Sequence, residues 1–190
     1  MKKRKIIIGI TGASGAIYAK LLISDLQKHS DSIEHVALLM SDNAKKVWLH
    51  ELQEEIRIPK NFTLYSKSDF NSPIASGSSN YDTMIICPCS MGTLGRIAAG
   101  TSDDLLLRAS DVMLKEKRKL ILVPRETPFS LIHLRNLSTL AEAGATIIPA
   151  IPSFYSLPST IEELARTVTN RVLSHAGFEN DSFSWGDEAL

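Results

Sequence analysis

The sequence has little of what several classes of protein require. Its two cysteines, Cys87 and Cys89, flank Pro88, so they are poorly placed for a disulfide bridge and too few for a metal site. Lys plus Arg and Asp plus Glu number 21 each, which leaves no basic excess for binding the backbone of a nucleic acid. No stretch approaches the roughly 18 apolar residues of a membrane span. We therefore expect no metal, no nucleic acid and no membrane among the partners of this protein.

The N-terminus only imitates a secretion signal. The basic residues 1–5 precede the apolar residues 6–8, but Gly9, Thr11 and Gly12 end the apolar run at once. The run is therefore too short for the core of a signal peptide. We interpret it as a first buried strand after a solvated basic start, and we expect a cytoplasmic protein.

Several nucleotide-binding and catalytic motifs are also absent. Ile10 occupies the place of the first glycine of a dinucleotide-binding loop, and the second apolar run ends at Ser41 rather than at an acid, with Asp42 one residue late. The chain contains neither a P-loop motif nor a nucleophile elbow, and Glu51 follows a histidine that lacks the second histidine of a zinc helix. Among nucleotide ligands, a mononucleotide phosphate remains.

Five short apolar runs alternate with helical stretches along the chain. Runs that are apolar on both faces are typical of parallel strands covered by helices on each side. The expected strands cover residues 5–10, 34–40, 83–87, 120–123 and 146–149, and the expected helices cover residues 15–28, 43–55, 102–117, 130–143 and 160–174. This pattern predicts a flavodoxin-like (Rossmann-like) α/β fold, in which a doubly wound parallel sheet forms the middle of three layers.

The alternation accounts for nearly the whole chain. We predict a single domain over residues 1–178 and a C-terminal tail over residues 179–190, because periodicity is lost after Gly177. The tail is a candidate for packing on a neighbouring subunit. Residues 71–80 form a conspicuous loop that is rich in turn formers and long enough for a functional role.

Small and hydroxylic residues follow two of the expected strands. Ligands of a doubly wound sheet bind beyond the carboxyl ends of its strands. Residues 11–15 open a helix after the first strand, and they are small enough to bring a phosphate close to the helix N-terminus, although a tight turn would need glycine too. After the third strand, Ser90 and Thr93 flank a second helix start, where they could bind a ligand or cap the helix. Two such starts at adjacent strand ends together favour phosphate binding.

Charged and aromatic side chains follow the later strands. Arg125 and Glu126 lie in a stiff loop between two prolines, where their position favours a function over a surface ion pair. Tyr155 lies in a similar loop after the fifth strand. Arg108 and Lys115 are seven residues apart and hence on one helix face, which by spacing alone favours a solvated face neutralised by acidic neighbours.

In their order along the chain these segments resemble the UbiX/Pad family of flavin prenyltransferases. The resemblance covers about residues 6–171, nearly the whole chain. The motifs that carry it are Gly12-Ala13-Ser14-Gly15, Ser76-Gly77-Ser78, Pro88-Cys89-Ser90-Met91-Gly92-Thr93, Arg108-Ala109-Ser110-Asp111-Val112, Leu114-Lys115-Glu116, Pro124-Arg125-Glu126-Thr127-Pro128-Phe129 and Phe154-Tyr155.

The resemblance implies an enzyme that transfers a dimethylallyl group from dimethylallyl phosphate to N5 and C6 of reduced FMN, without a metal. The product, prenylated FMN, would serve a UbiD-type decarboxylase. The family also implies a homo-oligomer, commonly a dodecamer, with sites at subunit contacts. The residues so implied are Gly12, Ala13, Ser14, Ser41, Ser90, Met91, Gly92, Thr93 and Arg125 for FMN, Arg108, Lys115, Tyr155 and Arg171 for the isoprenyl phosphate, and Ser14, Glu51 and Glu126 for catalysis.

The implied chemistry agrees with these residue types. Without a metal, the leaving phosphate must be stabilised by Lys and Arg. Ring closure on the flavin requires proton transfer, which suits a buried glutamate. Glu54 and Glu55 are close enough to Glu51 to be alternatives for its role.

Two other functions are compatible with the same fold. The first is a flavin-dependent cysteine decarboxylase, but that family carries a Pro-x-Met-Asn-x-x-Met-Trp stretch where residues 152–158 read Pro-Ser-Phe-Tyr-Ser-Leu-Pro. The second is an FMN electron carrier without substrate chemistry. Flavodoxins are usually acidic, whereas this chain is neutral and has cations after its strands.

Overall fold

The computed structural model describes residues 3–180, and within them the sheet has six strands, all parallel. The strands are β1 (Arg4–Ile10), β2 (Ile33–Met40), β3 (Phe62–Tyr65), β4 (Thr83–Cys89), β5 (Lys119–Pro124) and β6 (Thr146–Ile147). The expected tail over 179–190 lies outside the described residues except for its first two positions.

The strand order is β3-β2-β1-β4-β5-β6. Without the short edge strand β3, the remaining five strands follow the flavodoxin order 2-1-3-4-5. The chain proceeds outward from β1 through β2 to β3 and then returns to place β4 on the other side of β1. The strand order therefore reverses between β1 and β4, the point at which such sheets bind ligands.

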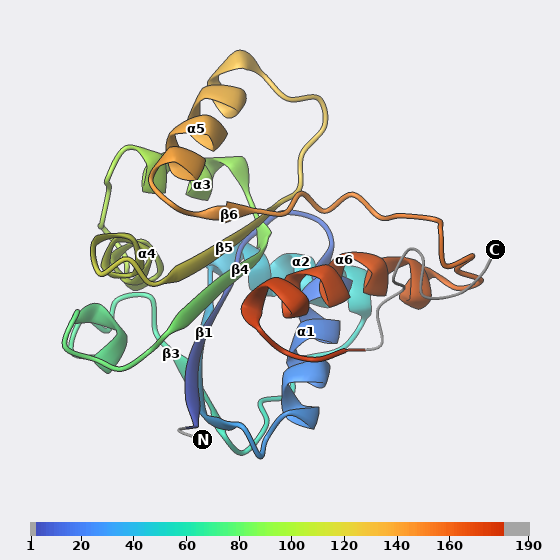
Figure 1. Ribbon diagram of the computed structural model, residues 1–190, viewed down its shortest axis with the longest axis horizontal. Helices are drawn as coiled ribbons and strands as arrows, with labels where there is room; N and C mark the ends of the chain where they lie inside the picture. Colours follow the sequence, from blue (N-terminus) through green and yellow to red (C-terminus); the bar gives the residue numbers. More distant parts are fainter. Residues whose placement is uncertain (1–2, 181–190) are drawn as a thin grey trace.

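Helices cover both faces of the sheet and complete the predicted three layers (Figure 1). One face packs on α1 (Ala16–Lys28), α2 (Asp42–Leu52) and α6 (Ile161–Ala176). The other face packs on α3 (Met91–Ala98), α4 (Leu105–Lys115), α5 (Leu131–Glu142) and the 3-10 turn η1 (Pro73–Ala75). Helix α1 is tied to α6 by the buried Asp25, which pairs with Arg166 at 2.7 Å.

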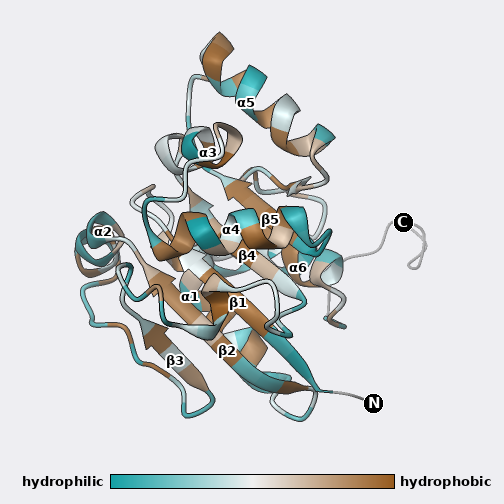
Figure 2. Ribbon diagram, turned by 90° about the vertical axis from the view of Figure 1, so that its left-hand side faces the viewer, coloured by the Kyte–Doolittle hydropathy of each residue, from teal (hydrophilic) through white to brown (hydrophobic). Residues whose placement is uncertain are grey.

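Two separate apolar cores explain why the strands read as continuous apolar runs. Alternate residues of a strand point to opposite faces. In β1, Ile6 and Ile8 belong to the core beneath α1 and α6, whereas Ile7 belongs to the core beneath α4. Figure 2 shows the resulting hydrophobic strands between helices that carry both hydrophobic and hydrophilic residues.

The five predicted strands and five predicted helices are confirmed, with shifted ends. The helix expected from residue 102 begins at Leu105, because the side chain of Asp104 caps it by accepting a hydrogen bond from the Leu107 N–H at 2.9 Å. The strand expected over 146–149 is shorter, but Ile148 N–H still donates to Leu122 O at 2.9 Å. Strand β3 and the full extent of α3 were not predicted.

A small polar cluster lies at the amino end of the sheet, between β2, β3 and β4. The ring of His35 is 2.8 Å from the Tyr81 hydroxyl through Nδ1 and 2.9 Å from the Thr63 hydroxyl through Nε2. A neutral imidazole accepts at one nitrogen and donates at the other, so it satisfies both contacts. Burial and the charge of Lys5 lower the pKa of His35 below its ordinary value, and Glu34 offsets this only in part.

This lowered pKa predicts that stability depends on pH through His35. Because the unfolded chain binds the proton more readily, the contribution of the neutral ring is complete above the unfolded value of 6.5 and is lost as the pH falls through the folded pKa. Urea unfolding between about pH 5 and about pH 7.5 should give a flatter stability profile for His35→Gln than for the wild type. His175→Gln, at an exposed position, should keep the wild-type profile. Identical profiles for His35→Gln and the wild type would contradict this prediction.

Candidate active site

The ends of β1 and β4 are joined by Thr11, a residue that is 2% exposed. Its hydroxyl donates to Pro88 O at 2.8 Å and accepts from Ser90 N–H at 2.7 Å. The two small-residue loops at the switch point are therefore held side by side. Thr11 belongs to the predicted loop of residues 11–15, but this link to β4 was not predicted, although a polar residue directly after an apolar strand is a usable signal.

The loop after β1 needs both of its glycines. Gly15 caps α1 with φ 111°, in the left-handed region that favours glycine, and a Cβ there would lie 2.7 Å from the Tyr18 ring. A Cβ on Gly12 would lie 2.6 Å from the Cβ of Asn43 on α2. The loop is thus pressed between its own helix and the start of α2.

Glu51 lies on the N-terminus of α1. Its carboxylate accepts hydrogen bonds from the N–H groups of Gly15 at 2.9 Å and Ala16 at 2.7 Å. Burial alone would raise the pKa of Glu51, but hydrogen bonds from Ser14, Ala16 and Gly15, helped by the positive charge of Arg125, outweigh burial and lower it. Glu54 instead pairs with Lys20 at 2.8 Å, which favours Glu51 over Glu54 as the glutamate of this site.

This contact changes where a phosphate fits. From the sequence we expected the phosphate at the N–H groups of the first turn of α1, but the carboxylate of Glu51 is bonded to two of them. An anion placed beside that carboxylate would be repelled. The starts of α2 and α3, on either side of β1, remain as N-terminal helix dipoles for a phosphate.

Serine caps both of those helices. Ser41 Oγ accepts from Ala44 N–H at 3.0 Å, and Ser90 Oγ accepts from Thr93 N–H at 3.4 Å while donating to the Thr93 hydroxyl at 3.1 Å. Between the Ser90 cap and Thr93, Gly92 is exposed, and a Cβ on it would meet no described atom within 4 Å. Ala13 and Met91 are buried in the loops after β1 and β4. They can contribute mainly backbone groups to the phosphate cradle, by which we mean the space between the starts of α2 and α3.

The loop after β5 brings a cation to the same edge. Arg125 Nε donates to Ser14 O at 3.0 Å, which links the loops after β5 and β1. Glu126 is exposed in the single chain, and its carboxylate accepts from Thr127 N–H at 3.0 Å. Among the described residues no ion pair joins Arg125 to Glu126, so the two side chains have separate environments.

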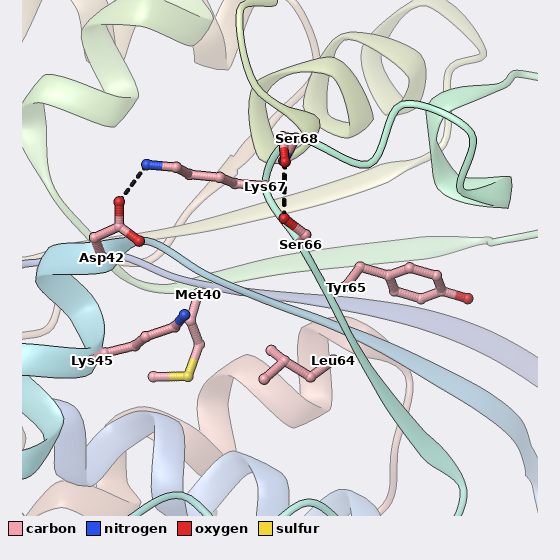
Figure 3. A pocket seen from close by; sticks show the side chains of 8 residues that line it. All are labelled: Met40, Asp42, Lys45, Leu64, Tyr65, Ser66, Lys67 and Ser68. Carbon is pink, nitrogen blue, oxygen red and sulfur yellow. Dashed lines mark hydrogen bonds and ion pairs between the residues drawn. The ribbon is translucent and has the colours of Figure 1, made fainter.

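A pocket of about 250 Å³ opens beside this cradle, at the carboxyl ends of β2 and β3 (Figure 3). Met40 and Leu64 line it together with Lys45 and Lys67, and Lys67 pairs with Asp42. None of the predicted site residues lines it, although Ser41 lies between two lining residues.

The predicted isoprenyl-phosphate residues do not meet the flavin residues within one chain. Lys115 is the last residue of α4, which leads into the start of β5 at the amino edge of the sheet. Arg108, on the same helix, pairs with Asp111 at 2.8 Å and donates to Ala75 O at 3.0 Å. Lys115 therefore lies away from the carboxyl edge, whereas Arg108, in the first turn of α4, lies nearer to it, because Leu105 N–H donates to Lys67 O just after β3 at 2.7 Å.

The loop that carries Tyr155 packs on α6, the helix that carries Arg171, because Ser153 N–H donates to Thr167 Oγ1 at 3.0 Å. Tyr155 is 68% exposed in the loop that follows β6, beyond the carboxyl edge. Arg171 is exposed on α6, five residues before the helix end at Ala176, whose carbonyl accepts from Arg4 at 2.7 Å near the start of β1. Helix α4 packs on the other face of the sheet from α6, so one chain alone does not bring Lys115 to Tyr155 and Arg171.

Comparisons with known proteins decide the family. The Flavoprotein family model matches residues 1–173. The flavin prenyltransferase UbiX of Methanocaldococcus jannaschii is 44% identical over 185 residues, which are 96% of this chain and 98% of the relative. The chain belongs to the UbiX family of flavin prenyltransferases.

Solved structures of UbiX-like proteins have the same fold. A dodecameric FMN-dependent UbiX-like decarboxylase from Escherichia coli O157:H7 is 38% identical, with a TM-score of 0.86 over 95% of this chain and 98% of its own. AnUbiX (PadA1) in complex with FMN and dimethylallyl pyrophosphate is also 38% identical, with a TM-score of 0.81 over 96% of this chain and 100% of its own. The predicted fold class and family are confirmed.

A flavin phosphate fits the described residues of this UbiX family member. The open space at Gly92 and the serine-capped starts of α2 and α3 provide N–H groups and hydroxyls that Glu51 does not occupy. Within residues 3–180, no group of three or more His, Cys, Asp and Glu residues could hold a metal. Over the same residues, no helix is both long and apolar enough to span a membrane.

The space at Gly92 predicts that Gly92→Ala separates FMN binding from stability. The added methyl group meets no described atom, so the flavin-free protein should keep its stability or gain up to about 1 kcal/mol from reduced chain entropy. If the flavin lies against Gly92, the Kd for FMN should rise by about tenfold or more, since overpacking costs about 1–3 kcal/mol.

Fluorescence titration with FMN and urea unfolding of the flavin-free protein measure the two effects. Gly12→Ala is the matched comparison, because its methyl group meets Asn43 and should lower stability itself. An unchanged Kd for FMN in Gly92→Ala would remove Gly92 from the flavin site.

Proposed function

We propose that this protein transfers a dimethylallyl group from dimethylallyl phosphate to reduced FMN. The observation that carries the proposal is the match over 96% of the chain, at 44% identity, to a curated flavin prenyltransferase. The solved relative AnUbiX, which contains both FMN and dimethylallyl pyrophosphate, supports the choice of acceptor and donor. Bound reduced FMN supplies the nucleophilic N5 and C6 atoms.

FMN is held at the switch point between β1 and β4. The phosphate lies between the starts of α2 and α3, where Ser41, Ser90 and Thr93 supply hydroxyls and Gly92 leaves room. Arg125, held by its bond to Ser14 O, adds a positive charge at the same edge. Its charge favours the electron-rich reduced flavin.

The isoprenyl phosphate is held by cations from more than one subunit. Lys115 lies away from the carboxyl edge of its own chain, so a neighbouring copy supplies it to each flavin. The dodecameric UbiX-like relative supports such an assembly. So do the large apolar side chains exposed on α5 and around the loop before α6, which a second copy would cover, namely Leu131, Ile132, Leu134, Ile151, Phe154, Leu157 and Ile161.

The charged residues have different roles in the proposed reaction. Lys115 and Arg171 stabilise the phosphate dianion as it leaves, a task that falls to fixed cations in the absence of a metal. Glu51 is held by hydrogen bonds that lower its pKa, so it is a weak base that orients the loop of residues 12–16. Glu126 accepts one backbone hydrogen bond through one oxygen and keeps the other for proton transfer.

The expected recipient of prenylated FMN, a UbiD-type decarboxylase, and the cytoplasmic location remain predictions. Neither follows from the residues of the site. The division into one domain over residues 1–178 and a tail likewise remains a prediction.

The product of one reaction tests the proposed function. The protein is mixed anaerobically with reduced FMN and dimethylallyl phosphate, and the mass of the released flavin is measured. A prenyltransferase yields a flavin heavier by one dimethylallyl unit, and a parallel reaction with the diphosphate establishes which donor is preferred. An unmodified flavin with both donors would refute the function and favour an electron carrier, and decarboxylation of a cysteine-terminated peptide would favour a cysteine decarboxylase.

Glu126→Gln tests the proton-transfer role. The substitution keeps the size of the side chain and an acceptor for Thr127 N–H, but it removes the titratable carboxyl. FMN and dimethylallyl phosphate should still bind, while ring closure slows by roughly 100-fold or more. A flavin alkylated at N5 but not cyclised should accumulate and be visible by its absorbance. If the variant instead loses FMN affinity and keeps its chemical step at saturating flavin, Glu126 is a binding residue and the proton-transfer role passes to Glu51 or Ser14.

A further inference from the structure

The end of α4 turns the chain back on itself. Lys117 has φ 52°, in the left-handed region, and Arg118 N–H donates to Met113 O at 2.8 Å. Together with the bond from Lys117 N–H to Leu114 O at 3.0 Å, this is a Schellman motif built without glycine. The turn directs Arg118 away from the helix axis and toward the loop that precedes β4.

Two guanidinium groups hold that loop by its carbonyl groups. Arg118 Nη2 donates to Gly77 O at 2.6 Å, and Arg108 Nε donates to Ala75 O at 3.0 Å. The neighbouring Ile74 is 1% exposed and packs in the core beneath α4. Arg118 Nη1 is buried and has no hydrogen-bond partner among the described residues. The loop is thus held at Ile74, Ala75 and Gly77 against α4 and the turn that follows it.

The docked loop presses against a charged pair. Lys115 Nζ donates to Glu116 Oε1 at 2.5 Å, and this hydrogen bond, together with the charge of Lys115, lowers the pKa of Glu116. A Cβ on Gly77 would lie 2.8 Å from Lys115 Nζ and would also collide with the Glu116 carboxylate. The backbone of Gly77 therefore borders the space in which the ammonium of Lys115 can lie.

We propose that Arg118 is a positioning residue for the isoprenyl-phosphate site. By holding Gly77 O, Arg118 keeps the loop of residues 75–78 against Lys115 and so sets where the ammonium points. This inference rests on the proposed function, in which Lys115 binds the phosphate of dimethylallyl phosphate. It adds two positions, Arg118 and Gly77, that act on the phosphate through Lys115.

A purely structural Arg118 would also donate to Gly77 O, but it would stabilise the loop without affecting phosphate binding. The experiment must therefore distinguish stabilisation of the loop from positioning of Lys115. Arg118→Met removes the donor and the charge, whereas Arg118→Lys keeps the charge and one donor. Gly77→Ala leaves every charge in place but displaces the ends of two flexible side chains, Lys115 and Glu116. Lys117→Met is the matched control, because it removes one positive charge from the same turn at an exposed position.

Binding and turnover are measured separately in each variant. Calorimetry gives the Kd for dimethylallyl phosphate in the full-length protein loaded with oxidised FMN, a state in which no transfer occurs. Inorganic phosphate serves as a second probe, without the isoprenyl group. Steady-state assays with reduced FMN give kcat and KM, and hydrogen exchange reports the order of residues 74–80.

We expect Arg118→Met and Gly77→Ala to raise the Kd for both probes, and the KM, by about tenfold, with kcat and the Kd for FMN nearly unchanged. Arg118→Lys should recover most of the affinity, and Lys117→Met should behave as the wild type. The double variant Arg118→Met/Gly77→Ala should lose little more than either single variant, because both act through Lys115. Hydrogen exchange of residues 74–80 should become faster in Arg118→Met only.

Three outcomes overturn the inference. Faster exchange in Arg118→Met with an unchanged Kd makes Arg118 purely structural. Equal losses in Arg118→Met and Lys117→Met reduce its role to general charge. Fully additive losses in the double variant show that Gly77 and Arg118 act independently. If the wild type binds dimethylallyl phosphate but never modifies the flavin, the proposed function fails, and the binding measurements still decide the role of Arg118.

Discussion

The geometry of the candidate site depends on the junction between the ends of β1 and β4, which a single buried hydroxyl closes. Thr11 both donates to the strand end at Pro88 and accepts from the first residue beyond it, Ser90. Two loops that come 77 residues apart in the chain thereby become neighbours with a fixed spacing. The cap of α3, the small residues after β1 and the contact from Arg125 to Ser14 all take their positions from this junction.

The sheet imposes the second constraint. Every strand is parallel, so every loop that follows a strand opens at one edge and every loop that precedes a strand opens at the other. The flavin residues follow strands, whereas Lys115 and the loop at Gly77 precede strands. This separation is a consequence of topology, and it explains why a site that needs both sets of residues must draw on more than one copy of the chain.

Much of the fold could be predicted from the sequence because its strands are buried on both faces. Ile6, Ile7 and Ile8 leave little choice but a covered parallel strand. Strand β3 was not predicted because only Phe62 is buried among its four residues. This is typical of an edge strand, which pairs on one side only. The start of α4 was misplaced because three polar residues precede it and only the geometry shows that the last of them, Asp104, is the cap.

The site was predicted less completely, for physical reasons. Residue type and strand position pointed to Ser90 and Arg125, and the family resemblance added Ser41, but contacts across the fold leave no trace in local sequence. The hydrogen bond between Glu51 and Gly15 spans 36 residues, and the approach of Gly12 to Asn43 joins the loop after β1 to α2. The proposed role of Lys115 depends on a neighbouring copy, which a single chain does not contain.

The carboxylate on the first turn of α1 has a consequence for how ligands are oriented. A doubly wound fold offers several helix N-termini at one edge, and each could receive a phosphate, so an elongated phosphate ester could enter in more than one direction. Glu51 fills one of these N-termini with a negative charge that belongs to the protein. One of these helix N-termini is thereby closed to a phosphate before any ligand arrives. This restricts the directions in which an elongated phosphate ester can bind.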